Sequence, residues 1–267
     1  MLANYHTHTD YCDGKSSAEE IVLSAISLGL SAIGFSGHGY TDFDLSYCMK
    51  DTEGYINEIL RLKDRYKGKI DILLGVEEDA RCPVLNRERF DYVIGSSHYS
   101  YKKGIYFPID SSVDRFKECL DSWGGDLIAF AKEYYDTFST YVEKRKPDIV
   151  GHFDLITKYD EVGGLGLLNN GLYDAVAIDA LNRILDTGCM IEVNTGAIAR
   201  GYRSIPYPSD YLLSELNSLG VGIVLTSDCH HPDNLDFAYD LSLPIIKAAG
   251  YRSIYNLTPD GFCEFEI

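Results

Sequence analysis

The sequence predicts an α/β fold in which seven βα units form a barrel, one unit short of the usual eight, and three observations support it. Short apolar, β-branched runs alternate with amphipathic stretches of helical period along the 267 residues. Most of the apolar runs end in a side chain that can bind a metal ion. No Pro/Ser-rich linker, low-complexity tract or repeat interrupts the series. Repeated βα units build a parallel sheet, and we expect one domain over residues 1–267.

Strands are expected where the apolar runs fall. Each run is short and rich in β-branched residues, as buried parallel strands are, and polar or glycine-containing segments separate the runs. The seven predicted strands cover residues 2–8, 32–38, 71–79, 92–98, 148–154, 190–196 and 222–230.

Helices are expected in the intervals between these strands. In the first interval Ser17 is the predicted N-cap, and Glu20, three residues later, completes a capping box. The predicted helical segments are 17–30, 53–68, 113–146, 173–188, 208–220 and 233–250. The last stretch of the chain, residues 253–267, is expected to form a short hairpin.

Composition and charge narrow the class of protein. No apolar run approaches the roughly 20 residues that span a bilayer, and the N-terminus lacks the basic and apolar regions of a secretory signal. The seven cysteines are scattered without a CxxC pair, so we expect reduced thiols and a cytoplasmic enzyme. A formal net charge of −17 repels polyanions and disfavours extended nucleic acid as a partner, although a local cationic pocket could still bind a small anion.

Potential metal ligands stand at the ends of the predicted strands. The carboxyl ends of barrel strands converge on one rim, where barrel active sites lie. Residues two apart on a strand point the same way, so two neighbouring pairs in the set could each chelate. The strand-end ligands are His6, His8, His38, Glu77, His98, His152, Asp228 and His230. Imidazole with carboxylate suits zinc, iron or manganese, and the lack of clustered cysteines argues against a structural four-cysteine zinc site.

Each of these residues taken alone has an ordinary explanation. His38 or His98 could be a partly buried ring bonded to backbone, and Glu77 could pair with a lysine at the rim. Asp13 stands in an Asp-Gly pair, which is a turn signal and requires no metal. Six of the seven histidines fall at strand ends and only His231 is left over, which favours one shared metal site.

Six short motifs follow one another in the chain: HTHTDYCDG from residue 6, SGHG from 36, GVEE from 75, GSSH from 95, GHFD from 151 and SDCH from 227. In this order and spacing they resemble the motifs of the polymerase and histidinol phosphatase (PHP) family, over residues 6–231. The resemblance implies a distorted (β/α)7 TIM-like barrel of the PHP type with a trinuclear metal site. Every motif position is filled by a competent ligand.

The resemblance also implies how the ligands are shared among three divalent ions, which could be zinc, iron or manganese. The first ion would be bound by His6, His8, Glu77 and Asp228. The second would be bound by Glu77 as a bridge, His98 and His152. The third would be bound by Asp13, His38 and His230.

Such a site suits hydrolysis of phosphate esters. Three divalent ions outweigh the three carboxylates, so the pocket would be cationic inside an acidic protein. A hydroxide that bridges two metals is expected to attack phosphorus, and Asp228 and His230, or the third metal, to assist departure of the alcohol.

Three basic residues are candidates for binding the phosphate. Arg200 and Arg203 follow the sixth predicted strand and could offer planar forks to phosphate oxygens, and Lys158 follows the fifth. Alternatively, each is a solvated loop charge paired with a surface carboxylate. The aromatic stretch at residues 98–107 could wall the pocket.

Within the family the chain is most similar to the stand-alone histidinol-phosphatases. The similarity rests on its length, the absence of polymerase segments, the EVNTG end of the sixth strand with its arginine-bearing loop, and the C-terminal hairpin. It implies hydrolysis of a small phosphorylated substrate, L-histidinol phosphate, to L-histidinol and phosphate in histidine biosynthesis. A phosphotyrosine-protein phosphatase, a nucleotide-releasing nuclease and a non-catalytic metal-binding module are the alternatives.

Overall fold

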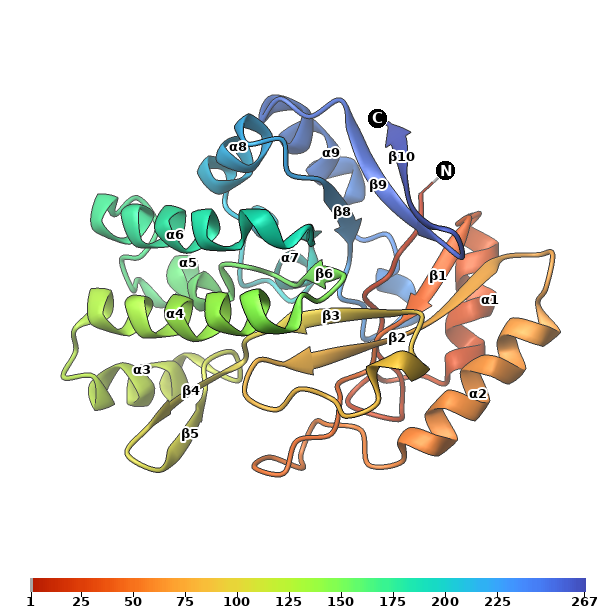
Figure 1. The fold of residues 1–267 in the computed structure, drawn as a ribbon, viewed down its shortest axis with the longest axis horizontal. Helices are drawn as coiled ribbons and strands as arrows, with labels where there is room; N and C mark the ends of the chain where they lie inside the picture. The colour runs from red at the N-terminus through yellow and green to blue at the C-terminus, as the bar shows by residue number, and fades with distance from the viewer. Residues whose placement is uncertain (1) are drawn as a thin grey trace.

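A curled parallel sheet forms the centre of the computed structural model, which describes residues 2–267 (Figure 1). Its strands are β1 (Ala32–Phe35), β2 (Asp71–Asp79), β3 (Tyr92–Ser96), β6 (Ile149–Val150), β7 (Met190–Asn194) and β8 (Ile223–Thr226). They are ordered β1-β2-β3-β6-β7-β8, and all neighbours are parallel. Each lies within a strand predicted from the sequence, and the order follows the chain, as in a barrel of βα units.

The first predicted strand, residues 2–8, closes the barrel without forming a regular strand. Asn4 bridges to Ile33 of β1 on one side, and Thr7 bridges to Cys229, beyond β8, on the other. The Asn4 side chain accepts a hydrogen bond from the backbone N–H of His6 at 3.0 Å, which removes that donor from any ladder. The fold is therefore the expected distorted barrel of seven units, with an irregular first member.

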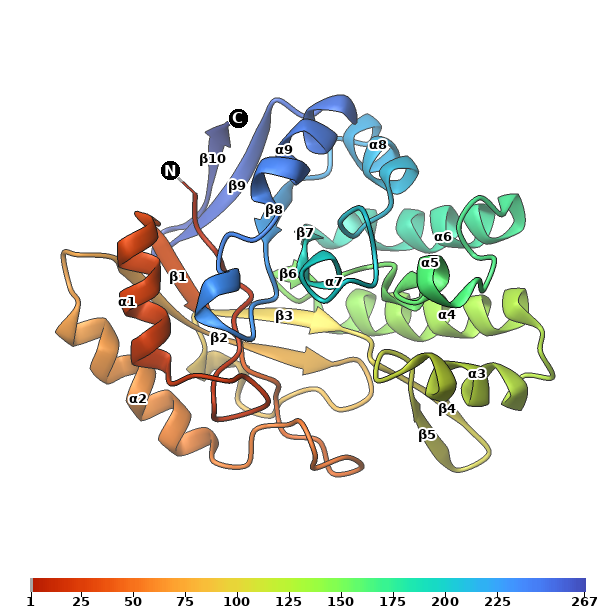
Figure 2. The same cartoon turned by 180° about the vertical axis from the view of Figure 1, so that it is seen from behind.

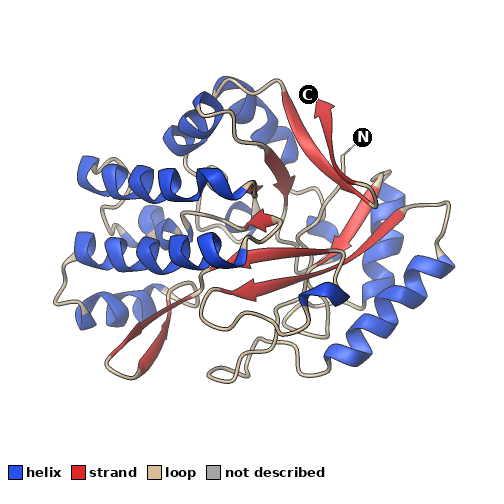
Figure 3. Ribbon diagram, viewed as in Figure 1, coloured by secondary structure: helices blue, strands red, loops and turns tan. Residues whose placement is uncertain are grey.

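Helices cover the outside of the sheet (Figures 2 and 3). The longer ones are α1 (Ala18–Leu28), α2 (Thr52–Arg65), α3 (Val113–Ser122), α4 (Leu127–Arg145), α6 (Gly171–Ile184), α8 (Asp210–Ser218) and α9 (Tyr239–Ala248), and the short ones are α5 (Asp160–Gly163) and α7 (Gly196–Ala199). The predicted capping box at Ser17 and Glu20 is present at the start of α1. Within residues 2–267, no helix combines the length and apolar character needed to cross a bilayer.

Two segments differ from the sequence prediction. The single helix expected over 113–146 is divided into α3 and α4. Gly124 and Gly125 both adopt positive φ, and the chain reverses at these glycines, between the two helices. Residues that the sequence suggested only as an aromatic wall form a hairpin, β4 (Tyr99–Lys102) and β5 (Ile105–Pro108). The hairpin projects from the sheet beside α3 (Figure 1).

The C-terminal segment of the chain forms the predicted hairpin. β9 (Ser253–Thr258) pairs antiparallel with β10 (Gly261–Glu266) and lies beside β8. Leu257 of β9 packs into an apolar cluster with Tyr5 and Tyr92, which fills the interior of the barrel. A Cβ at Gly34 or Gly75 would overlap the Tyr92 ring, so these two glycines make room for it. Apolar side chains therefore fill the space around Tyr92.

Candidate metal centre

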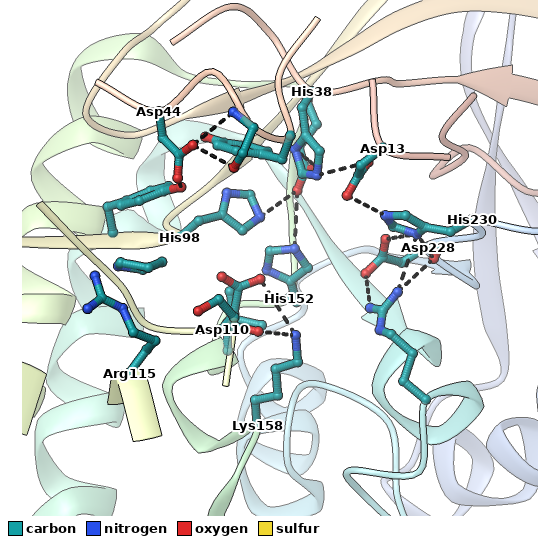
Figure 4. Close-up of a pocket in the computed structure, with 18 of the residues that line it drawn as sticks. Asp13, His38, Asp44, His98, Asp110, Arg115, His152, Lys158, Asp228 and His230 are labelled. Atoms are coloured by element: carbon teal, nitrogen blue, oxygen red, sulfur yellow. Dashed lines mark hydrogen bonds and ion pairs between the residues drawn. The ribbon is translucent and has the colours of Figure 1, made fainter. Parts of the chain in front are cut away.

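The carboxyl ends of the strands surround one cavity of about 710 Å³ (Figure 4). All nine side chains predicted to bind metal lie at this cavity or directly behind its wall. Asp13, His38, Glu77, His98, His152, Asp228 and His230 line it, and His6 and His8 are fully buried against them. Segments more than 200 residues apart in the sequence thus meet at one rim, as the strand-end pattern predicted.

Glu77, near the end of β2, lies at the centre of four histidines. Its Oε1 atom is 3.1 Å from Nε2 of His152 and 3.3 Å from Nε2 of His98. Its Oε2 atom is 2.9 Å from Nδ1 of His38 and 3.2 Å from Nε2 of His6. The two carboxylate oxygens therefore face different pairs of imidazoles, which is the arrangement a bridging carboxylate needs.

A second part of the cluster is built around His8. Its Nε2 atom is 3.3 Å from Oδ1 of Asp228, and its Nδ1 atom is 3.5 Å from Oδ1 of Asp13. Asp13 Oδ2 is in turn 3.3 Å from Nε2 of His230. The Asp13 side chain points into the cluster (Figure 4), so its Asp-Gly turn brings a carboxylate to the other ligands.

The nine side chains fall into four overlapping groups in which the candidate ligand atoms lie within 4.8 Å of one another. These groups are His8, Asp13, His38 and His230; His6, His8 and Asp228; His6, Glu77 and His152; and His38, Glu77 and His98. The grouping uses the same nine residues as the family pattern but shares His6, His8 and His38 more widely than that pattern implies.

Unpaired polar atoms show that the cluster suits cations. Nε2 of His6, Nε2 of His8, Oδ1 of Asp13 and Oε2 of Glu77 are buried and make no hydrogen bond of suitable geometry, although other polar atoms of the cluster lie within 4 Å of them. Buried polar atoms are normally hydrogen-bonded, because leaving one unpaired costs about 1–3 kcal/mol. Four such atoms converging in one place, all of them candidate ligand atoms, are explained by divalent ions that they would bind.

The electrostatics of the metal-free cluster point the same way. Burial favours a neutral Glu77, but His6, His38 and His98 outweigh it and hold the pKa of this carboxyl well below its usual value. Burial lowers the pKa of His8 to about 3, and the neighbouring His230 contributes. The ionised carboxylate of Glu77 and the neutral imidazole of His8 are the ligand states that bind a metal ion.

The backbone at Asp228 is strained. Asp228 has a φ of 48°, in the left-handed region that non-glycine residues rarely adopt. Its Oδ2 atom accepts a hydrogen bond from Nη2 of Arg200 at 2.7 Å. Glycine is required at Gly196, because a Cβ there would press on both of these side chains. The strain turns the Asp228 carboxylate toward the cluster.

Two of the three predicted basic residues line the cavity. Arg200 reaches it from the end of α7 and is held by Asp228. Lys158 reaches it from the segment after β6, and its Nζ donates to the Asp110 carbonyl oxygen at 2.6 Å and lies 3.6 Å from the Asp110 carboxylate. Burial lowers the pKa of Lys158, and Asp110 partly offsets that effect.

The third basic residue, Arg203, was predicted to contact the substrate but does not line the cavity. Its guanidinium is buried, forms an ion pair with Asp154 at 3.6 Å, and donates to Thr157 and to Ser209. It also stacks on the Tyr207 ring, with its Cζ atom 4.3 Å from the centroid. Arg203 therefore anchors the loop that follows Arg200.

The sequence prediction missed two carboxylates that orient the predicted ligands. Oε1 of Glu192, on β7, lies 2.5 Å from Nδ1 of His6, and its Oε2 accepts a hydrogen bond from the backbone N–H of His152. Asp79 likewise bonds Nδ1 of His98 at 3.2 Å. A charged residue inside the apolar run of β7 was the available signal, because a buried carboxylate requires partners.

Glu192→Gln is expected to weaken metal binding roughly 10- to 100-fold, because a carboxylate fixes the tautomer and basicity of a ligating imidazole. Titrating metal into the metal-free variant measures this affinity directly. The matched control is Glu53→Gln, which removes an exposed carboxylate on α2 and should bind metal like the wild type. Equal affinity in the Glu192 variant and the wild type would show that Glu192 does not tune His6.

Comparisons with known proteins agree with this geometry. The PHP domain model matches residues 4–196. The histidinol-phosphatase of Bacillus subtilis (strain 168) is 26% identical over 261 residues, covering 89% of this chain and 97% of the relative. The histidinol-phosphatase of Saccharomyces cerevisiae is 25% identical over 70% of this chain and 65% of the relative.

Solved structures show the same fold. The hisK protein of Listeria monocytogenes superposes with a TM-score of 0.78 and 21% identity, over 90% of this chain and 99% of that one. Histidinol phosphate phosphatase from Lactococcus lactis, crystallised with zinc, L-histidinol and phosphate, superposes with a TM-score of 0.66 and 21% identity over 98% of each chain. Since the PHP model matches well over half of its length, the chain belongs to the PHP family.

Proposed function

We propose that the chain is a metal-dependent phosphomonoesterase that hydrolyses L-histidinol phosphate to L-histidinol and phosphate. The observation that carries the proposal is the convergence of nine candidate ligands, five of them with an unpaired buried atom, at one cavity that Arg200 and Lys158 also line. The curated relatives named histidinol-phosphatase support the choice of substrate.

We assign three divalent ions, of zinc, iron or manganese, to the nine side chains. One would be held by His6, His8, Glu77 and Asp228, one by Glu77, His98 and His152, and one by Asp13, His38 and His230. Bound ions lower the pKa of a water molecule and neutralise charge on the phosphate. The described residues of the cavity include neutral and anionic donors of the kind these metals accept.

The cationic residues bind and orient the phosphate in this proposal. Asp228 fixes one face of the Arg200 guanidinium, and the remaining N–H groups can donate to phosphate oxygens. Lys158, held by Asp110 on the other side of the cavity, supplies a second positive charge. Both interactions strengthen as negative charge develops on the oxygens in the transition state.

Asp228 and His230 are our candidates for assisting departure of the alcohol. Nδ1 of His230 lies 3.0 Å from the backbone oxygen of Asp228, and its Nε2 faces Asp13. His230 is more exposed than the other histidines of the cluster, so a substrate oxygen can approach it. Within the proposal these two residues would hold metal ions beside the departing oxygen, and the charge of those ions would stabilise the alkoxide as the P–O bond breaks.

The function is tested by phosphate release from L-histidinol phosphate by purified protein loaded separately with zinc, manganese or iron. The proposal predicts turnover that is lost after chelation and restored by metal. Rapid hydrolysis of a phosphotyrosine peptide or a nucleotide without hydrolysis of L-histidinol phosphate would change the substrate and keep the chemistry. Absence of bound metal together with absence of activity on all of these substrates would support a non-catalytic module.

Metal affinity is expected to rise with pH. In the metal-free protein burial lowers the pKa of His6, but Glu192 and Glu77 outweigh it and raise the pKa well above 6.5, and Glu77 does the same for His98. These imidazoles therefore hold protons at neutral pH, which a metal must displace. Calorimetric titration in buffers of different ionisation enthalpy should show proton release, with weaker binding at about pH 6 than at about pH 8. Affinity independent of pH would contradict this.

The acidic surface makes extended nucleic acid an unsuitable substrate, because neutralising phosphates along a strand needs a basic path beside the site. We therefore place the chain with enzymes of small metabolites, as one domain over residues 1–267. A cytoplasmic location is part of the same proposal.

A further inference from the structure

The cavity has a second end that the metal ligands do not occupy. Asp44, Tyr47, Tyr99 and Pro108 line this end, and Arg115 lies at its edge. In Figure 4 Asp44 and Arg115 lie on the side of the cavity opposite Asp13, Asp228 and His230. Its residues come from the loop between β1 and α2, from the β4–β5 hairpin and, for Arg115, from α3; of these only the loop supplies a metal ligand, His38. This end is therefore available to the organic part of a substrate.

The Asp44 carboxylate is held in place by three hydrogen bonds. Oδ2 accepts from the Tyr99 hydroxyl at 2.7 Å, and Oδ1 accepts from both the backbone N–H and the hydroxyl of Ser46. These donors outweigh burial and lower the pKa of Asp44, so it is ionised at neutral pH. A carboxylate fixed in this way is preorganised to receive a ligand.

The charge of Asp44 has no protein counter-ion. Among residues 2–267, the other aspartates that line the cavity each face a cation or imidazole: Asp13 and Asp228 face the histidine cluster, and Asp110 faces Lys158. No lysine, arginine or histidine in this described range lies within 4 Å of the Asp44 carboxylate. Arg115, at the edge, is instead paired with Glu118. Asp44 is thus an anion without an ion-pair partner at this end, the reverse of what a second phosphate would need.

Aromatic rings connect Asp44 to the metal cluster. Tyr47 packs edge-on against His38, with the centroids 4.8 Å apart, and its ring lies 5.8 Å from that of Tyr99. Phe43 packs against Tyr99 and stacks on Tyr106 of the hairpin at 4.0 Å, which fixes the loop to the hairpin. The path from the ligands to Asp44 is therefore lined by aromatic rings, whose electron-rich faces attract cations.

We propose that Asp44, with the rings of Tyr47 and Tyr99, binds a protonated amino group carried by the alcohol part of the phosphoester. The subsite selects monoesters of cationic amino alcohols over uncharged alkyl or aryl esters. This inference rests on the proposed function, because it assumes that the phosphate binds at the metal cluster. It adds the residues that distinguish a cationic leaving group, which the metals themselves cannot do.

Asp44→Asn tests the subsite through substrate preference. It keeps the size of the side chain and removes its charge. The ratio of kcat/KM for L-histidinol phosphate to that for p-nitrophenyl phosphate, which carries no amine, is expected to fall roughly 10- to 100-fold, the range typical of a lost charge-assisted hydrogen bond. L-histidinol should also inhibit hydrolysis of p-nitrophenyl phosphate by the variant at least roughly tenfold more weakly.

The matched control is Asp42→Asn, which removes the same charge from an exposed position on the same loop that does not line this cavity. It should leave the ratio unchanged. Tyr99→Phe keeps the ring, removes a donor to Asp44 and should lower the ratio by a smaller factor, which provides a test if the Asp44 variant does not fold. An unchanged ratio in both the Asp44 and Tyr99 variants, or an equal fall in the control, would overturn the subsite.

Failure of the subsite and failure of the proposed function give different results. If the wild type hydrolyses p-nitrophenyl phosphate but not L-histidinol phosphate, the proposed substrate is wrong before any variant is compared. If the wild type prefers L-histidinol phosphate and the Asp44 variant keeps that preference, the substrate stands and the subsite is wrong.

Discussion

Glu77→Gln is expected to reduce phosphate release on the order of 10³-fold and to lower the number of ions bound per chain. The fall should exceed the 10- to 100-fold typical of residues that only orient a ligand, because Glu77 itself faces four imidazoles. An amide carries no charge and is a poor ligand for these metals. Its NH₂ group would also face imidazole nitrogens whose lone pairs are needed to bind a metal ion.

Glu78 provides the matched control for this variant. It is the next residue on β2, points the opposite way, and pairs with Arg145 at 2.9 Å while accepting from the Tyr141 hydroxyl. Glu78→Gln should lower the melting temperature yet keep the metal content. Metal counted by elemental analysis separates the two variants, and a Glu77 variant with a full set of ions and normal turnover would remove Glu77 from the centre.

Arg200→Ala and Arg203→Ala are expected to fail in different ways. Loss of Arg200 should lower kcat/KM on the order of 10²- to 10³-fold, as expected when a donor to transition-state charge is removed. Loss of Arg203 leaves Asp154 buried without its ion-pair partner, which costs about 3–5 kcal/mol of unfolding free energy. The Arg203→Ala protein should therefore have a lower free energy of unfolding than the wild type, whatever the substrate concentration.

Steady-state kinetics and urea unfolding distinguish these outcomes. The Arg200 variant should unfold within about 1 kcal/mol of the wild type, since its guanidinium is part-exposed at the cavity. The Arg203 variant should recover much of its turnover at low temperature, where the folded fraction is high. Strong destabilisation by the Arg200 change with little kinetic effect would place this arginine with Arg203 as a structural residue.

The metal ligands were predictable because they obey local rules. Side chains two apart on a strand face one way, and parallel strands of a barrel end at one rim. His6 with His8 and Asp228 with His230 do lie together in the cluster, although residues 2–8 are not a regular strand and β8 ends at Thr226. Even Asp13, which the turn signal alone left open, lies with the cluster.

The other features of the site depend on contacts between segments far apart in the sequence, and no local sequence pattern predicts such contacts. Arg200 and Arg203 are three residues apart in one loop, yet one lines the cavity and the other is buried, because only tertiary packing decides which carboxylate each meets. In the sequence Glu192 looks like an ordinary buried strand residue, because its partner His6 is 186 positions away. The position of the Asp44 carboxylate depends on its hydrogen bond from Tyr99 of the β4–β5 hairpin. The sequence pattern did not predict the strands of this hairpin.

The central claim is tested most directly by an anomalous difference map. The crystals would be of the metal-loaded protein grown with inorganic phosphate, and the data would be recorded at the absorption edge of the metal. The account predicts three peaks among the nine ligands, with Glu77 between two of them and Arg200 in contact with the phosphate. A single peak, or peaks away from Glu77 with phosphate bound elsewhere, would contradict it.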